Sequence, residues 1–237
     1  MIDNIISTIK EDSPVKEVRA CVFWTAALSK NCGLASTLRE HGPHHGVSPV
    51  PEAGSLLKKT ALGLAAHAHS DSLPLASIGM AAINSLIEID LNRCVEKNAF
   101  EILREKGKGK TIAVVGHFPF VPKLEKIAAE LYVLEKHPAE DDLAEEKAAE
   151  ILPNADVVAI TGTSLINHTF EKLTALCQNS FVVVLGPSTP LSPVLFDYGV
   201  DVISGTMVSD SDSVLRCISE GANFRQIQGV RLLTMVG

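Results

Sequence analysis

A short apolar run that ends in glycine constrains the fold of this chain more than any other stretch. The run Ile112–Val115 is mostly β-branched and is followed directly by Gly116. Four apolar residues are too few for a helix core, but they suit a strand that is buried on both faces of a parallel sheet. A helical pattern begins near Val121. This order of strand, glycine turn and helix predicts the start of a doubly wound α/β fold, which binds ligands at the carboxyl ends of its strands.

The rest of the second half repeats this alternation. The further predicted strands are residues 131–134, 155–160, 180–185 and 200–203, with 229–236 as a last candidate. The predicted helices are residues 121–130, 141–150, 191–198 and 210–220, and one more that begins at Asn167 as its N-cap. Strands that alternate with helices imply a parallel sheet with right-handed crossovers, so the predicted fold class is α/β.

Parallel strands bring the turns at their carboxyl ends to one edge of the sheet. His117 is the candidate catalytic residue there, because an imidazole titrates near neutral pH. The alternative is a turn histidine that bonds only to the backbone. The neighbouring carboxylate, hydroxyls and backbone amides are candidates for ligand binding. These ligand-binding candidates are Gly116, Phe118, Glu135, Thr161, Thr163, Ser164, Asn167, Gly186, Pro187, Ser188 and Thr189.

Two features of these turns bear on the class of ligand. Glu135 follows Gly116 by 19 residues, close to the spacing at which an acidic residue binds the ribose of a dinucleotide. The second and third glycines of that motif are missing, because residues 117–119 are His-Phe-Pro. Proline removes a backbone donor and the bulky side chains obstruct a pyrophosphate, which argues against ordinary NAD binding. Glu135 is therefore either a ligand contact or a solvated strand end.

The first half predicts a separate α+β region. Its predicted elements are an amphipathic helix over residues 1–10, two strands that pair as an antiparallel hairpin at 18–27 and 32–38, and helices at 55–70, 75–86 and 98–106. Residues 107–110, Gly-Lys-Gly-Lys, have the composition of a linker, so the expected domains are 1–106 and 107–237. Gly79 predicts tight packing or a nearby ligand. Asn84 is either a satisfied core amide or a ligand contact.

Histidines and cysteines do not define a closed metal site in the sequence. Three histidines fall within residues 41–45 of a glycine- and proline-containing loop, where they are incidental, metal-ligating, or part of a loop that covers the substrate. The five cysteines are scattered and form no CxxC, which predicts buried free thiols. Metal-ligating residues stay unknown, and a metal ion or a nucleotide-like ligand remains open as the cofactor.

Charge and hydropathy limit the classes of binding partner that we expect. The formal net charge is −7 and no basic run occurs, which excludes nucleic acid and anionic membrane surfaces as expected partners. No apolar run reaches about 18 residues, and the N-terminus lacks the pattern of a signal peptide, so we expect a cytoplasmic protein. The expected partner is a small-molecule ligand, and self-association into a homo-oligomer is left open.

Five motifs together resemble the putative heavy-metal chelation family, a domain-of-unknown-function family of prokaryotic proteins. The motifs are Val114–Pro119, Glu135–Pro138, Glu150–Pro153, Gly186–Phe196 and Ala76–Asn84, and the likeness covers nearly the whole chain. The resemblance implies a small α+β domain like the N-terminal domain of enolase, followed by a Rossmann-like doubly wound parallel sheet, with an active site between them. Enolase holds its metal in a barrel domain that this chain lacks, so enolase chemistry is not implied.

Carried over position by position, the family motifs place Gly116, His117, Glu135, the Gly186 turn and Asn84 at or near the cleft. The resemblance also implies a role in making or processing chelator-like molecules of the pterin, flavin or siderophore type. Three hypotheses follow. The first is an enzyme of condensation or hydrolysis that uses His117 as its acid–base group. The second is a non-catalytic protein that binds a heavy metal or a metal chelate, and the third is a methyltransferase-like enzyme that uses S-adenosylmethionine.

Overall fold

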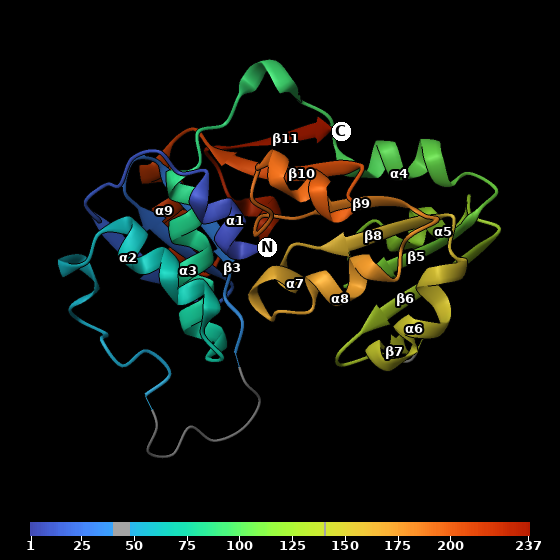
Figure 1. Ribbon diagram of the computed structural model, residues 1–237, viewed down its shortest axis with the longest axis horizontal. Helices are drawn as coiled ribbons and strands as arrows, with labels where there is room; N and C mark the ends of the chain where they lie inside the picture. Colours follow the sequence, from blue (N-terminus) through green and yellow to red (C-terminus); the bar gives the residue numbers. More distant parts are fainter. Residues whose placement is uncertain (40–47, 140) are drawn as a thin grey trace.

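The computed structural model describes residues 1–39, 48–139 and 141–237, and it contains two sheets within these residues (Figure 1). The strands are β1 (Glu17–Ala20), β2 (Trp24–Leu28), β3 (Cys32–Ser36), β4 (Cys94–Val95), β5 (Thr111–Val115), β6 (Glu130–Glu135), β7 (Leu143–Ala144), β8 (Val157–Thr161), β9 (Phe181–Leu185), β10 (Val202–Val208) and β11 (Val230–Val236). The α-helices are α1 (Ile2–Ser7), α2 (Ala61–Ala65), α3 (Leu73–Leu86), α4 (Ala99–Gly107), α5 (Val121–Glu125), α6 (Ala148–Ile151), α7 (Thr163–Ile166), α8 (Phe170–Ala175) and α9 (Ser211–Ser219). Short 3₁₀ turns are η1 (Leu56–Lys58), η2 (Ala66–His69), η3 (Leu91–Arg93), η4 (Glu145–Lys147), η5 (Leu152–Asn154), η6 (Pro193–Tyr198) and η7 (Phe224–Gln226).

The large sheet confirms the predicted α/β fold. Its strand order is β4-β11-β10-β9-β8-β5-β6-β7, and every pair from β10 to β7 is parallel. From β5 the chain goes outward to β6 and then returns to β8 on the other side of β5. In a doubly wound sheet such a reversal opens a ligand crevice between the two strands on either side of it, here β5 and β8. The last strand, β11, pairs antiparallel to β10.

Alternating side chains of the large sheet are buried on both faces, which explains the near-continuous apolar runs in the sequence. One face, which includes Val114 and Ala159, packs on α4 and α5. The other face, which includes Val115 and Ile160, packs on α7, α8 and the helices of the first half. The sheet is therefore covered on both sides, and its edges at the strand ends are where a ligand can enter.

The small antiparallel sheet β1-β2-β3 is also covered on both faces. Helix α3 packs on one face, where a Cβ added at Gly33 would lie 2.0 Å from the carbonyl oxygen of Ala81. Helix α9, from the far end of the sequence, packs on the other face through Val214, Leu215 and Ile218 (Figure 1). The small sheet is thus held between an early helix and a late one, and the two halves of the chain share contacts there.

The predicted helix at 75–86 is confirmed as α3, and Gly79 is explained by packing. A Cβ at this position would lie 2.0 Å from the backbone nitrogen of Ala68, so only glycine permits the close approach of α3 to η2. The domain boundary at 106/107 stays a prediction. Helix α4, which ends at Gly107, packs on the large sheet, and β4 pairs with β11.

The predicted strand over residues 18–27 is wrong, because it is a hairpin of β1 and β2. Val22 and Phe23 form its turn and are 54% and 51% exposed, and the Cys21 N–H donates to the Trp24 carbonyl at 2.9 Å. Neither glycine nor proline marks this turn, so the apolar alternation concealed it. The second hairpin, β2 with β3, is confirmed, with Leu28 opposite Cys32.

Three predicted helices are shorter or absent. Residues 55–70 break at Thr60, which is extended, bridges to Pro14 and caps α2 by accepting from the Gly63 N–H. Helix α5 ends at Glu125 rather than at residue 130. Of residues 141–150, the first four are not helical, because Leu143 pairs with β6 as part of β7, and the last six form η4 and the start of α6. Tertiary pairing overrides a weak helical preference in this acidic stretch. Along the part of the chain described, no helix combines the length and the apolarity needed to cross a membrane.

Candidate functional site

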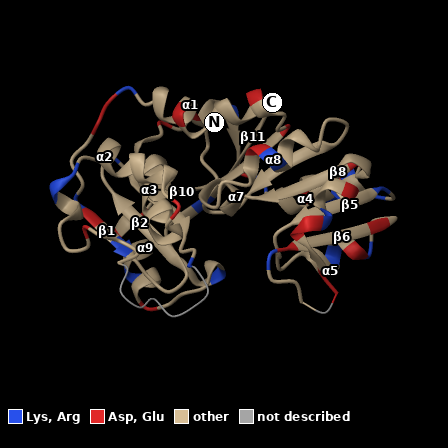
Figure 2. Cartoon of the chain, turned by 60° about the horizontal axis from the view of Figure 1, so that its bottom comes forward, with Lys and Arg blue, Asp and Glu red and all other residues tan. Residues whose placement is uncertain are grey.

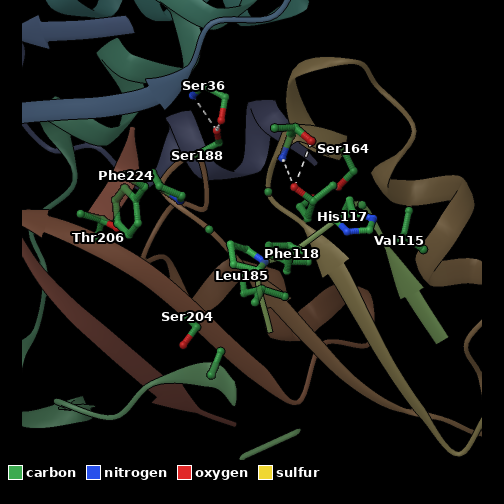
Figure 3. A pocket seen from close by; sticks show the side chains of 18 of the residues that line it. Ser36, Val115, His117, Phe118, Ser164, Leu185, Ser188, Ser204, Thr206 and Phe224 are labelled. Atoms are coloured by element: carbon green, nitrogen blue, oxygen red, sulfur yellow. Dashed lines mark hydrogen bonds between the residues drawn. The ribbon is translucent and has the colours of Figure 1, made fainter. Parts of the chain in front are cut away.

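A cavity of about 1010 Å³ lies at the carboxyl ends of the parallel strands, where the small sheet closes one side (Figure 3). Residues of β2 and β3, among them Trp24 and Ser36, form the wall contributed by the first half of the chain. The turns after β5, β8 and β9 form the opposite wall. The cavity brings together eleven of the predicted site residues: Gly116, His117, Phe118, Glu135, Thr161, Thr163, Ser164, Asn167, Gly186, Pro187 and Ser188.

Glycine is required where these turns approach one another. Gly116 has φ +101°, and a Cβ there would lie 2.9 Å from the Cβ of Thr161 on the neighbouring turn. A Cβ at Gly162 would lie 2.4 Å from the hydroxyl oxygen of Thr189. The turns after β5, β8 and β9 therefore pack in direct contact at the point where the strand order reverses, and they form the floor of the cavity.

His117 has a carboxylate partner that sequence analysis missed. Its Nδ1 lies 3.3 Å from the Oδ2 of Asp142, whose side chain is only 6% exposed and also accepts the Ala139 N–H at 3.1 Å. The His117 side chain is 53% exposed. A carboxylate at Nδ1 fixes the proton on that nitrogen, which leaves Nε2 as the free base toward the ligand. Asp142 stood in a predicted solvated helix, so no local pattern marked it.

The turn after β8 has its hydroxyls ordered by internal hydrogen bonds. The hydroxyls of Thr161 and Thr163 lie 3.0 Å apart, and the Ser164 hydroxyl donates to the Thr161 carbonyl at 2.7 Å. The predicted N-cap role of Asn167 is wrong. It follows α7, and its Oδ1 accepts from the Thr169 hydroxyl at 2.8 Å ahead of α8.

Asn84 and Thr189 lie behind the cavity wall rather than on it. The Asn84 Nδ2 donates to the Leu34 carbonyl at 2.9 Å and, more weakly, to the Ser188 carbonyl at 3.4 Å. The Ser36 N–H donates to the Ser188 hydroxyl at 2.9 Å. These bonds fasten the Gly186–Ser188 turn to the small sheet. The hydroxyl of Thr189 and the Oδ1 of Asn84 are buried without a hydrogen-bond partner among the residues described.

The cavity wall is more cationic than the chain as a whole. Among the residues that the structure describes, five cations, Arg39, Lys97, Lys123, Lys136 and Arg225, line it against two carboxylates, Glu135 and Glu145. The chain itself has a net charge of −7, and residues of both signs are spread over the molecule (Figure 2). A concave wall with an excess of positive charge raises the local concentration of anionic solutes, so the described part of the wall favours an anionic ligand.

Aromatic side chains gather at the same cavity, although they make up only 5% of the chain. Phe118 stacks on Phe120 with ring centroids 5.1 Å apart and an angle of 8° between planes, and Phe100 packs beside them at 5.7 Å. Trp24 and Phe224 form a second, tilted pair at 5.6 Å. All five line the cavity. Aliphatic residues fill the core, so this concentration of rings points to a ligand with a planar group.

The residues described provide no metal-ligand cluster. No group of three or more His, Cys, Asp or Glu side chains is placed to hold an ion in residues 1–39, 48–139 and 141–237. Burial raises the pKa of the Cys32 and Cys177 thiols to about 12, so they stay protonated and are poor ligands. The histidines at 41–45 lie outside the described residues. The described side chains therefore do not fit a directly bound heavy metal.

Comparison with known proteins decides the family. Two family models with the same description, "Putative heavy-metal chelation", match the chain: DUF4213 over residues 2–87 and DUF364 over residues 98–236. The chain belongs to the DUF364 family. Both matches agree with the resemblance that the sequence motifs indicated. The gap between them, residues 88–97, contains η3 and β4.

Solved structures of the DUF364 family share the whole fold. A protein of unknown function from Desulfitobacterium hafniense is 29% identical, with a TM-score of 0.87 over 100% of this chain and 97% of that one. A second, from Pyrococcus horikoshii, is 19% identical with a TM-score of 0.84 over 100% and 98%. An uncharacterized protein of Methanocaldococcus jannaschii is 28% identical over 90% of this chain and 85% of its own length. The names of these three proteins state no reaction.

Proposed function

We propose that this DUF364 protein binds a planar, anionic, chelator-like small molecule in the cavity and acts on it by condensation or hydrolysis, with His117 as the acid–base group. The observation that carries the proposal is the His117–Asp142 pair at the switch point of the large sheet. A carboxylate that orients an imidazole is the arrangement that acid–base catalysis needs.

The ligand class follows from the cavity wall. The excess of cations favours an anion, and the aromatic pairs favour a planar ring. Aromatic siderophore units combine both properties, as do pterins and flavins that carry a carboxylate or a phosphate. The family description is compatible with such a ligand, because a metal can arrive already bound to the chelator. The residues that we describe then need to contact only the organic part.

The chemistry assigned to each group is simple. In hydrolysis, the Nε2 of His117 accepts a proton from the attacking water and returns it to the leaving group. Condensation runs through the same proton transfers in reverse, and water leaves. Asp142 stabilises the imidazolium that forms between the two transfers. The turns at Thr161–Ser164 and Gly186–Ser188 supply hydroxyls and backbone amides to the anionic part of the ligand.

Binding without catalysis is the second candidate, and the family description is the observation that favours it. In that case the cavity holds a metal chelate and His117 is only a contact. The third and weakest candidate is a methyltransferase-like function that uses S-adenosylmethionine. Glu135 lines the cavity where a ribose would bind, but residues 117–119 carry no glycine.

A thermal-shift screen separates these functions. Pterins, flavins and dihydroxybenzoates are tested alone and with Fe³⁺, beside S-adenosylmethionine and nucleotides, because a ligand that binds the folded state raises the melting temperature. The leading ligand is then incubated with wild-type protein and with His117→Gln, and the products are followed by mass spectrometry. We expect an organic chelator to bind without metal and to be converted only by the wild type. Binding without conversion by the wild type supports the second candidate, and conversion by His117→Gln at the wild-type rate contradicts the proposal.

A further inference from the structure

The cavity extends well beyond the reach of His117. Thr206 of β10 and His117, which follows β5, both line it, and β9 and β8 lie between these two strands. Three strand spacings correspond to about 14 Å across the sheet. In Figure 3, Phe224 and Thr206 lie on one side of the pocket and His117 on the other, with Leu185 and Phe118 between them. A single ring beside His117 leaves the far part of this cavity unfilled.

We propose that the far part of the cavity is a second binding subsite, which takes a planar aromatic ring carrying a carboxylate. We call it the Trp24 subsite and define it by Trp24, Thr206, Phe224 and Arg225. It extends the proposed function, because a condensing or hydrolysing enzyme must hold two groups, one on each side of the bond. Its existence does not depend on catalysis by His117.

The apolar part of the Trp24 subsite is fixed before any ligand binds. The indole N–H of Trp24 donates to the Ala222 carbonyl at 2.9 Å, which ties β2 to the segment before η7. The Asn223 side chain accepts the Arg225 N–H at 3.0 Å, and the Gln226 side chain accepts the Asn223 N–H at 2.9 Å. This reciprocal cap holds Phe224 against Trp24. A preorganised pair of rings loses little entropy when a third ring packs on it.

The polar part of the subsite is not satisfied within the protein. Thr206 lines the cavity, and its hydroxyl oxygen is buried and has no hydrogen-bond partner among the described residues. The side chain of Arg225 is exposed at the same wall, and no described residue forms an ion pair with it. A second cation, Arg39, bonds to the Val22 carbonyl two residues before Trp24. The unpaired Thr206 hydroxyl and the Arg225 guanidinium, which lie beside aromatic rings, match a ring with a carboxylate.

Trp24 is the single tryptophan of the chain, so its fluorescence reports directly on the subsite. The full-length protein is titrated with benzoate, with the non-planar cyclohexanecarboxylate and with the uncharged benzyl alcohol. We expect a saturable change of Trp24 emission with benzoate, at an affinity at least about threefold higher than for either analogue. Equal affinity for the three compounds, or no saturable change with benzoate, overturns the proposal.

Amino-acid substitutions test which residues form the Trp24 subsite. Arg225→Gln and Phe224→Leu are each expected to weaken benzoate binding at least about threefold, because they remove the charge or the ring. Arg216→Gln is the matched control, since Arg216 is an exposed arginine of α9 outside the cavity wall. His117→Gln is expected to leave the benzoate titration unchanged, whatever it does to turnover. Wild-type affinity in both Arg225→Gln and Phe224→Leu, with their melting temperatures intact, contradicts the subsite. Loss of binding in His117→Gln alone contradicts it as well.

Discussion

The two ends of the cavity differ in chemistry although they share a wall of rings and cations. The His117 end, which comprises His117, Phe118 and Asp142, has a titratable base with an oriented partner. The Trp24 subsite has a ring pair and an arginine but no group that exchanges protons near neutral pH. In our proposal, the first end changes a ligand and the second only holds one.

This difference also reflects the two ways in which the ends are built. In the His117 end, His117 and Phe118 follow β5, which the sequence pattern marks clearly, and Asp142 joins them from the segment directly before β7. The Trp24 subsite joins residue 24 to residues 222–225 across almost the whole chain. If the comparison holds, substitutions at the His117 end reduce turnover, and substitutions at the Trp24 subsite reduce affinity.

Asp142→Asn is expected to have the largest effect, about a hundredfold loss of turnover of the ligand found by the screen. The amide no longer stabilises the imidazolium and allows the wrong tautomer. Asp141→Asn is the matched control, because Asp141 is the exposed neighbouring carboxylate. Initial rates at saturating ligand measure the effect. Equal rates in Asp142→Asn and wild type would show that the two ends do not differ as we describe.

Gly162→Ala is expected to destabilise the floor of the His117 end by about 1–3 kcal/mol, since its Cβ would lie 2.4 Å from the Thr189 hydroxyl. Gly63→Ala is the matched control. A Cβ in α2 meets nothing closer than 3.4 Å, so this substitution is expected to raise stability by about 0.5–1 kcal/mol. Urea unfolding measures both free energies. Similar values for the two variants would contradict the close packing of the turns.

Asn84→Ala is expected to lower the free energy of unfolding by about 1–2 kcal/mol, because it leaves the buried Leu34 and Ser188 carbonyls without this donor. Asn4→Ala removes the exposed bond from Asn4 to the Tyr198 hydroxyl and is expected to cost less than about 0.5 kcal/mol. Chemical denaturation compares the two. An equal cost would show that the contact between the small sheet and the Gly186–Ser188 turn is not fixed by Asn84.

The loss of stability at alkaline pH is expected to come from two buried thiols that do not line the cavity. Burial raises the pKa of the Cys32 and Cys177 thiols from 9.0 to about 12. Their contribution is complete below pH 9 and is lost as the pH rises toward 12, since the unfolded chain releases these protons first. By about pH 9.5 the loss stays below about 1 kcal/mol per thiol. Cys32→Ala should make the free energy of unfolding fall less steeply as the pH rises above 9. Arg225→Gln and His117→Gln should leave the slope unchanged, and a changed slope in either variant would be evidence against this assignment.

Much of the fold could be predicted because the relevant signals are local. The strands β5, β8 and β9 are apolar runs with a polar or glycine-containing turn directly after them. Their parallel pairing follows from alternation with helices, and it places their turns together. For the same reason, eleven of the thirteen predicted site residues line one cavity.

The features that sequence analysis missed depend on contacts that no local sequence pattern marks. Asp142 reaches His117 only because β7 pairs with β6 at the sheet edge, and composition alone favoured a solvated helix. Trp24 reaches Phe224 because α9 carries the end of the chain across to the small sheet. The hairpin turn at residues 22–23 carries apolar residues, which hid it in a strand-like pattern.

The most direct test of the account is the tautomer of His117, measured by nitrogen-15 NMR of its imidazole at neutral pH in wild type and in Asp142→Asn. The account predicts that the neutral ring of the wild type carries its proton on Nδ1, facing Asp142, and that Asp142→Asn loses this preference. A proton on Nε2 in the wild type, or an identical spectrum in the variant, would contradict the assignment of His117 as the oriented base of the cavity.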